Sequence, residues 1–329
     1  KVFTLYMDFL PFIQETYYPL VDFQIQLTIR TFSPSNHIMT HKEGNIMSSY
    51  NNVGIFGGDK RHEYMATSLL DKGYSVSTYM LQGIVTLKNH TMVESFDTLI
   101  KLNKVLIGSI AMSSHPLSKQ DHAFITQMLT KDHLLIAGNI PEDIIDLCKK
   151  KEAFCYDLMK CDSIAIINAI ATAEGTIMEA IKSSDSNLHG SNCLVLGYGR
   201  CGKVLAAKLK GLDANVTVAA RREDALAYAK AAGHSTIIIN EMKSALSTFQ
   251  FIFNTIPSLI IGQEYLNRVS ADVLIIDIAS APGGVDFDYA TSQGINTKLC
   301  LGLPGKVAPK DSAEILVNKI EALIKERSG

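Results

Sequence analysis

The sequence has no tryptophan, no Cys-x-x-Cys pair and no excess of either charge. With 31 basic and 33 acidic side chains and a net charge of −2, there is no surplus of cations to displace the counterions of a phosphate backbone, which argues against nucleic acid as a partner. The six cysteines lack the spacing of a metal or disulfide framework, so we expect reduced thiols in a cytoplasmic protein and no metal site. No run of about 18 apolar residues occurs, so no membrane-spanning helix is predicted.

Residues 1–46 are rich in aromatic side chains but lack the basic segment, apolar core and small-residue cleavage site of a signal peptide. Met47 precedes a polar stretch and then an apolar strand. We therefore interpret 1–46 as an extension that is foreign to the native protein, with Met47 as its start. An additional helix and a disordered tail are alternatives that the sequence leaves open.

The remaining chain is long enough for two domains. Residues 47–163 are interpreted as a Rossmann-like substrate domain, because short apolar runs alternate there with polar or helical segments, as in a parallel sheet. The runs that predict its strands are 53–56, 75–79, 104–107 and 134–137. Isoleucines at near-helical spacing over 164–183 predict a long helix in a linking segment, 164–187.

A second domain is predicted over 188–300, with strands expected at 192–196, 215–219, 236–239, 251–254 and 273–276. In the last segment, 301–329, residues 312–326 form an amphipathic helix that is expected to pack back on the first domain. The predicted fold class is α/β: two doubly wound Rossmann-like domains joined by a long helix, with a returning C-terminal helix.

The sharpest motif lies between a predicted strand and a predicted helix. Its glycines have the G-x-G-x-x-G spacing that gives a tight turn, close approach of the backbone to a pyrophosphate, and packing of helix on strand. The helix N-terminus adds unpaired N–H groups and a positive dipole end. The predicted cofactor-binding residues are Gly197, Tyr198, Gly199, Arg200, Cys201 and Gly202.

The next strand ends in Arg221 and Arg222, where an NAD-specific domain would place a carboxylate for the adenosine ribose. Two guanidinium groups can bind a 2′-phosphate, so we predict NADP. NAD stays open, because Glu223 or Asp224 lies within reach of the same ribose, and a solvated basic turn is a further alternative.

Loops after later strands should lie beside the nicotinamide, because open α/β sheets bind ligands at the carboxyl ends of their strands. One such loop contributes the cofactor-binding candidates Asn254, Thr255, Ile256 and Pro257. Another, 277–284, contributes the substrate-binding candidate Ser280. Both loops are rich in residues that also make ordinary turns.

Other polar residues are candidates for binding a small dianionic substrate, for which nearby cations are favourable. Ordinary solvated or structural roles are the alternative for each of them. Three are histidines, whose imidazoles titrate near neutral pH; His189 is expected to be structural. The candidates are Arg61, His62, His115, Thr172, Glu174, Thr176, His189, Lys306 and Lys310.

Taken together, several motifs resemble the A subunit of dipicolinate synthase from endospore-forming bacteria, over a range from about Val53 to the C-terminal helix. The motifs that carry this resemblance are 57–61 (GGDKR), 172–178 (TAEGTIM), 189–191 with 196–202 (HGS and LGYGRCG), 254–258 (NTIPS), 279–287 (ASAPGGVDF) and 302–310 (GLPGKVAPK). Residues 1–46 have no counterpart in that family.

The resemblance implies an NADP-linked oxidation of a dihydrodipicolinate-type product of the diaminopimelate pathway to pyridine-2,6-dicarboxylate, in the mother cell during sporulation. It also implies an oligomer and a separate, flavoprotein-like B subunit. On this basis Arg61, Lys306 and Lys310 are expected to neutralise the substrate carboxylates, and Glu174 or His115 to take the proton. Lys306 is also a candidate catalytic residue.

Two other functions stay open. One is a generic two-domain dehydrogenase of the alanine or 2-hydroxy-acid type, although no histidine-rich loop follows Asp277. The other is a non-catalytic NADP-binding subunit that acts as a scaffold for its B partner.

Overall fold

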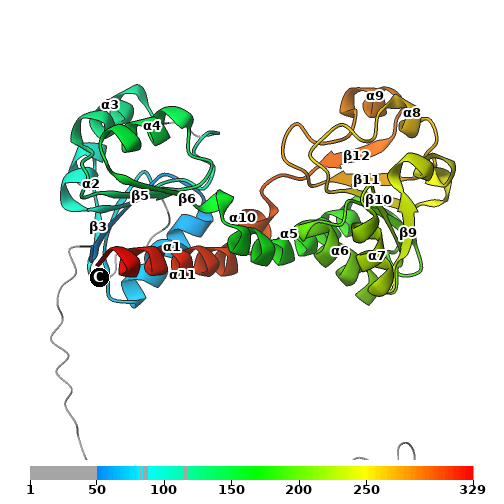
Figure 1. The fold of residues 1–329 in the computed structure, drawn as a ribbon, viewed down its shortest axis with the longest axis horizontal. Helices are drawn as coiled ribbons and strands as arrows, with labels where there is room; N and C mark the ends of the chain where they lie inside the picture. Colours follow the sequence, from blue (N-terminus) through cyan, green and yellow to red (C-terminus); the bar gives the residue numbers. More distant parts are fainter. Residues whose placement is uncertain (1–49, 82, 84–87, 115–116, 329) are drawn as a thin grey trace, which may run out of the picture. The chain divides into compact units, whose positions relative to one another are not determined.

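The computed structural model describes residues 50–81, 83, 88–114 and 117–328. The proposed start at Met47, the extension 1–46 and the candidate His115 lie outside these residues. Within them the chain forms two six-stranded parallel sheets with helices between most successive strands (Figure 1).

The first sheet has the strand order β3-β2-β1-β4-β5-β6. Its order reverses between β1 and β4: the chain adds β2 and β3 on one side of β1, then returns to add β4, β5 and β6 on the other. The strands are β1 (Asn52–Phe56), β2 (Ser75–Tyr79), β3 (His90–Met92), β4 (Val105–Ile107), β5 (Leu134–Ala137) and β6 (Phe154–Asp157).

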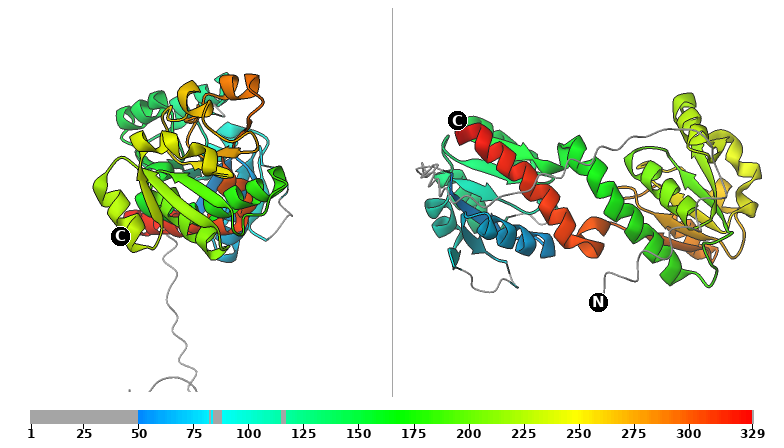
Figure 2. Two further views of the ribbon diagram at one scale, coloured as in Figure 1. Left: turned by 90° about the vertical axis from the view of Figure 1, so that its right-hand side faces the viewer. Right: turned by 90° about the horizontal axis from the view of Figure 1, so that it is seen from below.

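Helices cover both faces of this sheet. One face packs against α1 (Lys60–Asp71) and the C-terminal helix α11 (Pro309–Ser328), which run side by side in Figures 1 and 2. The other face packs against α2 (Phe96–Leu102), α3 (Lys119–Met128) and α4 (Glu142–Lys150). The predicted return of the C-terminal helix to the first domain is confirmed. Leu316, Val317 and Ile320 of α11 are fully buried there, each contributing about 1.5–3 kcal/mol of hydrophobic stabilisation.

The second sheet has the order β12-β11-β10-β7-β8-β9. Its strands are β7 (Asn192–Leu196), β8 (Asn215–Ala220), β9 (Ser235–Ile238), β10 (Phe251–Asn254), β11 (Leu274–Asp277) and β12 (Asn296–Leu299). One face packs against α5 (Asp162–Ser183), α6 (Arg200–Gly211), α7 (Glu223–Ala231) and α10 (Leu303–Val307), and the other against α8 (Gln263–Leu266) and α9 (Phe287–Ser292). Both sheets are therefore doubly wound, as predicted.

The long helix α5 contributes to both cores: Ile164 is buried in the core of the first sheet, and Ala173 and Ala180 in that of the second. By length and composition alone, α5 could cross a membrane, but 44% of its most apolar window is buried inside the protein. Core helices of folded proteins commonly meet the same criterion, because a helix that is apolar on several sides packs in an interior.

The strands that the sequence did not predict are β3, β6 and β12, and each lies at the edge of its sheet. Edge strands bury few side chains, so their sequences lack the apolar run of a central strand. In β12, for example, Asn296 and Leu299 are exposed, and Thr297 and Lys298 are only partly buried.

Candidate functional site

The loop between β7 and α6 has the geometry of a dinucleotide-binding turn. Gly197 has a φ of +91°, a conformation that side chains other than glycine rarely adopt. A Cβ on Gly202 would overlap the carbonyl oxygen of Gly197, so the third glycine lets helix α6 pack against the end of β7. A Cβ on Gly199 would meet nothing within 4 Å. The backbone is therefore open at the one glycine where a pyrophosphate would approach.

The loop after β10 packs directly on this turn. The Thr255 hydroxyl donates to the carbonyl of Leu196 over 2.8 Å, and a Cβ on Gly197 would lie 2.6 Å from the same hydroxyl oxygen. Strands β7 and β10 are neighbours, so the 254–257 loop and the glycine turn meet at the same edge of the sheet. Ile256 is half-buried against Gly197, and Pro257 is exposed.

Asn254 has a structural role. It is fully buried, donates to the Ile256 carbonyl over 3.1 Å and donates to Asp277 Oδ1 over 3.0 Å. Its side-chain oxygen accepts from the Ile256 N–H. Asn254 therefore shapes the loop that carries Thr255 and Ile256, and its amide is already occupied.

Asp277, at the end of β11, was not among the predicted site residues. This fully buried carboxylate accepts hydrogen bonds from the backbone N–H groups of Ala279 (2.9 Å) and Gly284 (2.6 Å), besides that from Asn254. It fixes the loop in which Ser280 is exposed at the carboxyl end of the sheet. A carboxylate that ends an apolar strand and precedes a glycine-rich loop is the sequence signal that points to such a role.

Other residues of the glycine-rich motif contact protein groups. The Tyr198 ring packs edge-on against His234, with ring centroids 6.1 Å apart. Arg200 pairs with Asp162 over 2.6 Å. Cys201 is partly buried, and this burial is the main cause that raises the pKa of its thiol. These side chains support the turn between β7 and α6, and the backbone of the motif is left to face a ligand.

The two arginines after β8 differ in their surroundings. Arg222 forms a bidentate pair with Asp224, with distances of 2.9 and 2.5 Å. Arg221 is exposed and has no hydrogen-bond or ion-pair partner among the residues that the structure describes. Because β8 lies next to β7, both arginines follow the strand end where the adenosine ribose lies in this fold. Arg221 is the better placed for a 2′-phosphate.

The polar residues of α5 are engaged locally. Glu174 is more than half exposed and pairs with Lys208 of α6 over 2.9 Å. Thr176 is fully buried and donates to the Thr172 carbonyl, and Thr172 donates to the Asn168 carbonyl. The Glu174–Lys208 pair links α5 to α6, whereas the two threonine hydrogen bonds lie within α5.

At the start of α1, Asp59 caps the helix. Its carboxylate also pairs with the Arg61 guanidinium, and the shortest distance, from Arg61 Nη2 to Asp59 Oδ2, is 2.6 Å. Burial raises the pKa of Asp59, but hydrogen bonds from His62 and Arg61 and the charge of Arg61 lower it well below its usual range. His62 is fully buried, and its ring contacts the Asp59 N–H and the Gly108 carbonyl. His62 is thus a structural residue, and His189 is exposed, 3.5 Å from Asp213.

The 302–310 segment meets the start of α1. A Cβ on Gly305 would lie 2.8 Å from Arg61 Nε, so Arg61 rests against α10, which also carries Lys306. Lys306 and Lys310 are exposed, and neither pairs with an acidic group among the described residues. A hydrogen bond from Lys298 is the main cause that lowers the pKa of Glu179, and the charge of Lys306 adds to it. The fold thus brings Arg61 and the lysine-bearing segment together.

All six cysteines are free thiols. Among the described residues, no group of three or more histidine, cysteine or acidic side chains has the arrangement of a metal site.

Two family models match the chain. Residues 52–159 match the N-terminal domain of the A subunit of dipicolinate synthase, and residues 165–284 match the NAD-binding domain of D-isomer-specific 2-hydroxyacid dehydrogenases. The first match covers the sheet that begins with β1. The second covers the glycine turn, the two arginines after β8 and the Asp277 loop.

Individual relatives agree with these matches. The A subunit of dipicolinate synthase from Bacillus subtilis (strain 168) is 39% identical over 225 residues, which cover 67% of this chain and 73% of that protein. The crystal structure of the corresponding protein from Bacillus halodurans matches with a TM-score of 0.77 and 31% identity over 83% of this chain and 97% of that one. A transhydrogenase from Sinorhizobium meliloti, 14% identical over 83% of this chain and 94% of its own, shares the fold with a TM-score of 0.61.

Proposed function

Because the chain belongs to the family of dipicolinate synthase A subunits, we propose that it oxidises a dihydrodipicolinate-type intermediate of the diaminopimelate pathway to pyridine-2,6-dicarboxylate. The observation that carries this proposal is the turn between β7 and α6, in which Gly197 and Gly202 form a tight strand-to-helix connection and Gly199 is open to a ligand. A nicotinamide cofactor fits this turn, since a backbone N–H cluster at a helix start binds a pyrophosphate.

NADP is the cofactor that we propose. The support is Arg221, which is exposed and unpaired within the described residues at the end of β8, while Arg222 is held by Asp224. An arginine in this position favours a 2′-phosphate through a charge-assisted hydrogen bond.

The reaction removes a hydride from one ring carbon and a proton from its neighbour, and the ring becomes aromatic. A nicotinamide cofactor held at the turn between β7 and α6 would supply the hydride acceptor. Aromatisation supplies much of the driving force, so the protein chiefly has to position the ring and its two carboxylates. We assign carboxylate binding to Lys306, Lys310 and the Nη1 group of Arg61, whose Nε and Nη2 are held by Asp59. The fold brings the Arg61 side chain against the segment that carries both lysines.

Further groups complete the proposal. Ser280 and the 254–257 loop lie at the carboxyl edge of the second sheet and would line the nicotinamide end of a bound cofactor. Because Glu174 is paired with Lys208, we propose His115, the other candidate from the sequence, as the base that takes the proton. We place the enzyme in the mother-cell cytoplasm during sporulation, as an oligomer that works with a flavoprotein-like B subunit.

The test is cofactor reduction, followed by nicotinamide absorbance, with NADP and freshly generated dihydrodipicolinate, in the presence and absence of the B subunit. Reduction coupled to dipicolinate formation supports the proposal, and a requirement for B means that the two proteins share the site. Tight NADP binding without reduction under either condition would instead support the scaffold function. In the same assay, Lys306→Ala should raise KM for the substrate, and an unchanged KM would remove Lys306 from the site.

A further inference from the structure

A cavity of about 440 Å³ opens at the carboxyl ends of β1, β2 and β4 in the first sheet. It is separate in sequence from the dinucleotide turn, and its lining residues lie between Phe56 and Asp121. The strand order reverses between β1 and β4, and open parallel sheets bind ligands at such reversal points. The cavity therefore lies where this fold places a ligand.

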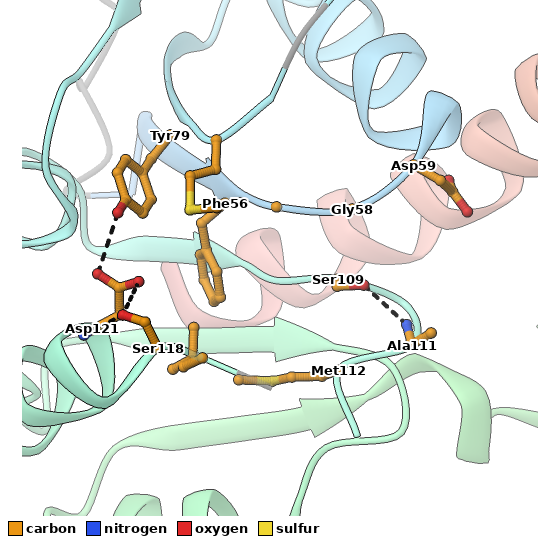
Figure 3. A pocket seen from close by; sticks show the side chains of 12 residues that line it. Phe56, Gly58, Asp59, Tyr79, Ser109, Ala111, Met112, Ser118 and Asp121 are labelled. Atoms are coloured by element: carbon orange, nitrogen blue, oxygen red, sulfur yellow. Dashed lines mark hydrogen bonds between the residues drawn. The ribbon is translucent and has the colours of Figure 1, made fainter. Parts of the chain in front are cut away.

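The walls of the cavity are largely apolar and aromatic (Figure 3). Phe56 and Tyr79 line it, and both rings pack against Phe96, with centroids 4.9 and 5.8 Å away. Met112, which is also a lining residue, is buried. Rings that are fixed from behind keep their orientation, so they offer a rigid surface to a flat ligand.

Two carboxylates line the cavity from opposite sides: Asp59, which pairs with Arg61, and Asp121 (Figure 3). Asp121 is 5% exposed and accepts hydrogen bonds from the Tyr79 hydroxyl over 3.3 Å and from the Ser118 hydroxyl over 2.8 Å (Figure 3). Burial is the main cause that raises the pKa of Tyr79, and Asp121 adds to it, so Tyr79 remains a donor. Among the described residues, no cationic side chain pairs with Asp121.

Helix capping accounts for only part of this arrangement. Ser118 caps α3 by accepting from the Asp121 N–H over 3.1 Å, which explains why the two side chains meet. Capping requires neither burial of the carboxylate nor a cavity beside it. A buried carboxylate with two neutral donors and no counter-charge is costly, and a cationic ligand would offset that cost.

The backbone beside the cavity is also strained. Met80, a lining residue that is 70% exposed, has a φ of +54°, which is an uncommon conformation for a residue other than glycine. Such conformations persist where the surrounding structure or a function requires them.

We propose that this cavity binds a small ligand with a flat apolar body and a protonated amine, with the ring against Phe56 and Tyr79 and the amine at Asp121. This site adjoins the substrate site proposed above, because Asp59 lines the cavity and pairs with Arg61. It differs from that site in charge, since the Asp121 carboxylate in an apolar wall repels a dianion. It would give the protein a second, cationic ligand in addition to its anionic substrate.

The test uses benzylamine as the probe, with benzyl alcohol as its neutral analogue and benzoate and dipicolinate as anions. The full chain is labelled with ¹³C at the methionine methyl groups, and the signals of Met80 and Met112 are assigned with leucine variants. We expect benzylamine to shift both signals at concentrations where the anions do not. Absence of a benzylamine shift would overturn the inference. Shifts caused by dipicolinate instead would assign the cavity to the substrate and would overturn it as well.

The matched variants are Asp121→Asn and Asp97→Asn. Asp97 also lies in the first turn of a helix, α2, but it pairs with Lys101 outside the cavity. Asp121→Asn should weaken benzylamine binding about tenfold, because it removes the charge and keeps the shape. Asp97→Asn should leave binding unchanged. Equal affinity in Asp121→Asn and wild type would contradict the inference, and the wild-type titration remains decisive if the variant does not fold.

Discussion

The side chain of Arg61 lies directly against the backbone of Gly305, so that a Cβ on Gly305 would be 2.8 Å from Arg61 Nε and 3.0 Å from Asp59 Oδ2. The two residues come from opposite ends of the described chain, and only the packing of α1, α10 and α11 brings them together. Glycine at this position is therefore what allows the Asp59–Arg61 pair to rest against the segment that carries Lys306.

Gly305→Ala should displace Arg61 and weaken the binding of dipicolinate about fivefold, since the added methyl group would lie only 2.8 Å from Arg61 Nε. Cofactor affinity should not change, because Gly305 is far from the glycine turn in sequence and a Cβ there would meet Arg61 and Asp59 first. Isothermal titration with each ligand measures both effects. Gly211→Ala is the matched control, because a Cβ there meets nothing within 4 Å. Unchanged dipicolinate affinity in Gly305→Ala would remove Arg61 from the substrate site.

The glycine turn gives a paired prediction. Gly199→Ala should leave the melting temperature close to that of the wild type, because its Cβ meets no protein atom, but should weaken cofactor binding at least about tenfold by blocking the pyrophosphate. Gly202→Ala should lower both the melting temperature and the affinity, because its Cβ overlaps the Gly197 carbonyl. Thermal unfolding with and without cofactor separates the two cases. Full affinity in Gly199→Ala would place the pyrophosphate elsewhere.

Cofactor choice should depend on Arg221 more than on Arg222. Arg221→Ala should weaken NADP binding about tenfold and leave NAD binding nearly unchanged, since only NADP has a 2′-phosphate. Arg222→Ala should have a smaller effect, because Asp224 already occupies that guanidinium. Dissociation constants of both cofactors for both variants check this ranking. A wild type that binds NAD more tightly than NADP would show that Arg221 has no such role.

Much of this architecture follows from the sequence, and the exceptions have physical reasons. Central strands such as β7 and β10 are predictable because they are buried on both faces and read as apolar runs. Edge strands such as β12 are not predictable in this way, because they contain partly buried polar residues such as Thr297 and Lys298 and no apolar run. The glycine turn is predictable because its requirements are local: Gly197 has a positive φ, and Gly202 packs against the Gly197 carbonyl five residues earlier.

Site residues that act through distant partners were less predictable. Glu174 has the character of a base in the sequence, but its partner Lys208 lies on another helix. His62 has the character of an acid or base, yet its ring completes the cap of α1. Asp121 has no sequence signal beyond a helix start, because its hydrogen-bond partner Tyr79 lies on strand β2, 42 residues away.

The thiol of Cys161, at the start of α5, gives a pH-dependent prediction. Hydrogen bonds from Ser163 and from the backbone N–H of Ile164 lower the pKa of Cys161 to about 7, whereas burial raises the pKa of Cys193 to about 12. The thiolate is the reactive form and predominates above the pKa. Alkylation of Cys161 by iodoacetamide should therefore rise about tenfold from about pH 6 to pH 8, while Cys193 stays unmodified.

Peptide mass spectrometry over a pH series measures this reactivity. Ser163→Ala should move the midpoint for Cys161 upward, because it removes the hydrogen bond that contributes most to the shift. A midpoint at the ordinary value of a cysteine thiol in the wild type would contradict the assignment.

The central claim is that this chain transfers a hydride from the substrate ring to a nicotinamide cofactor bound at the Gly197–Gly202 turn. The most direct test is to supply ring-deuterated dihydrodipicolinate with NADP and to analyse the recovered cofactor by mass spectrometry. We predict that the reduced cofactor gains one deuterium for each dipicolinate formed, and that Gly199→Ala slows this transfer. Formation of dipicolinate with no deuterium in the cofactor would contradict the account.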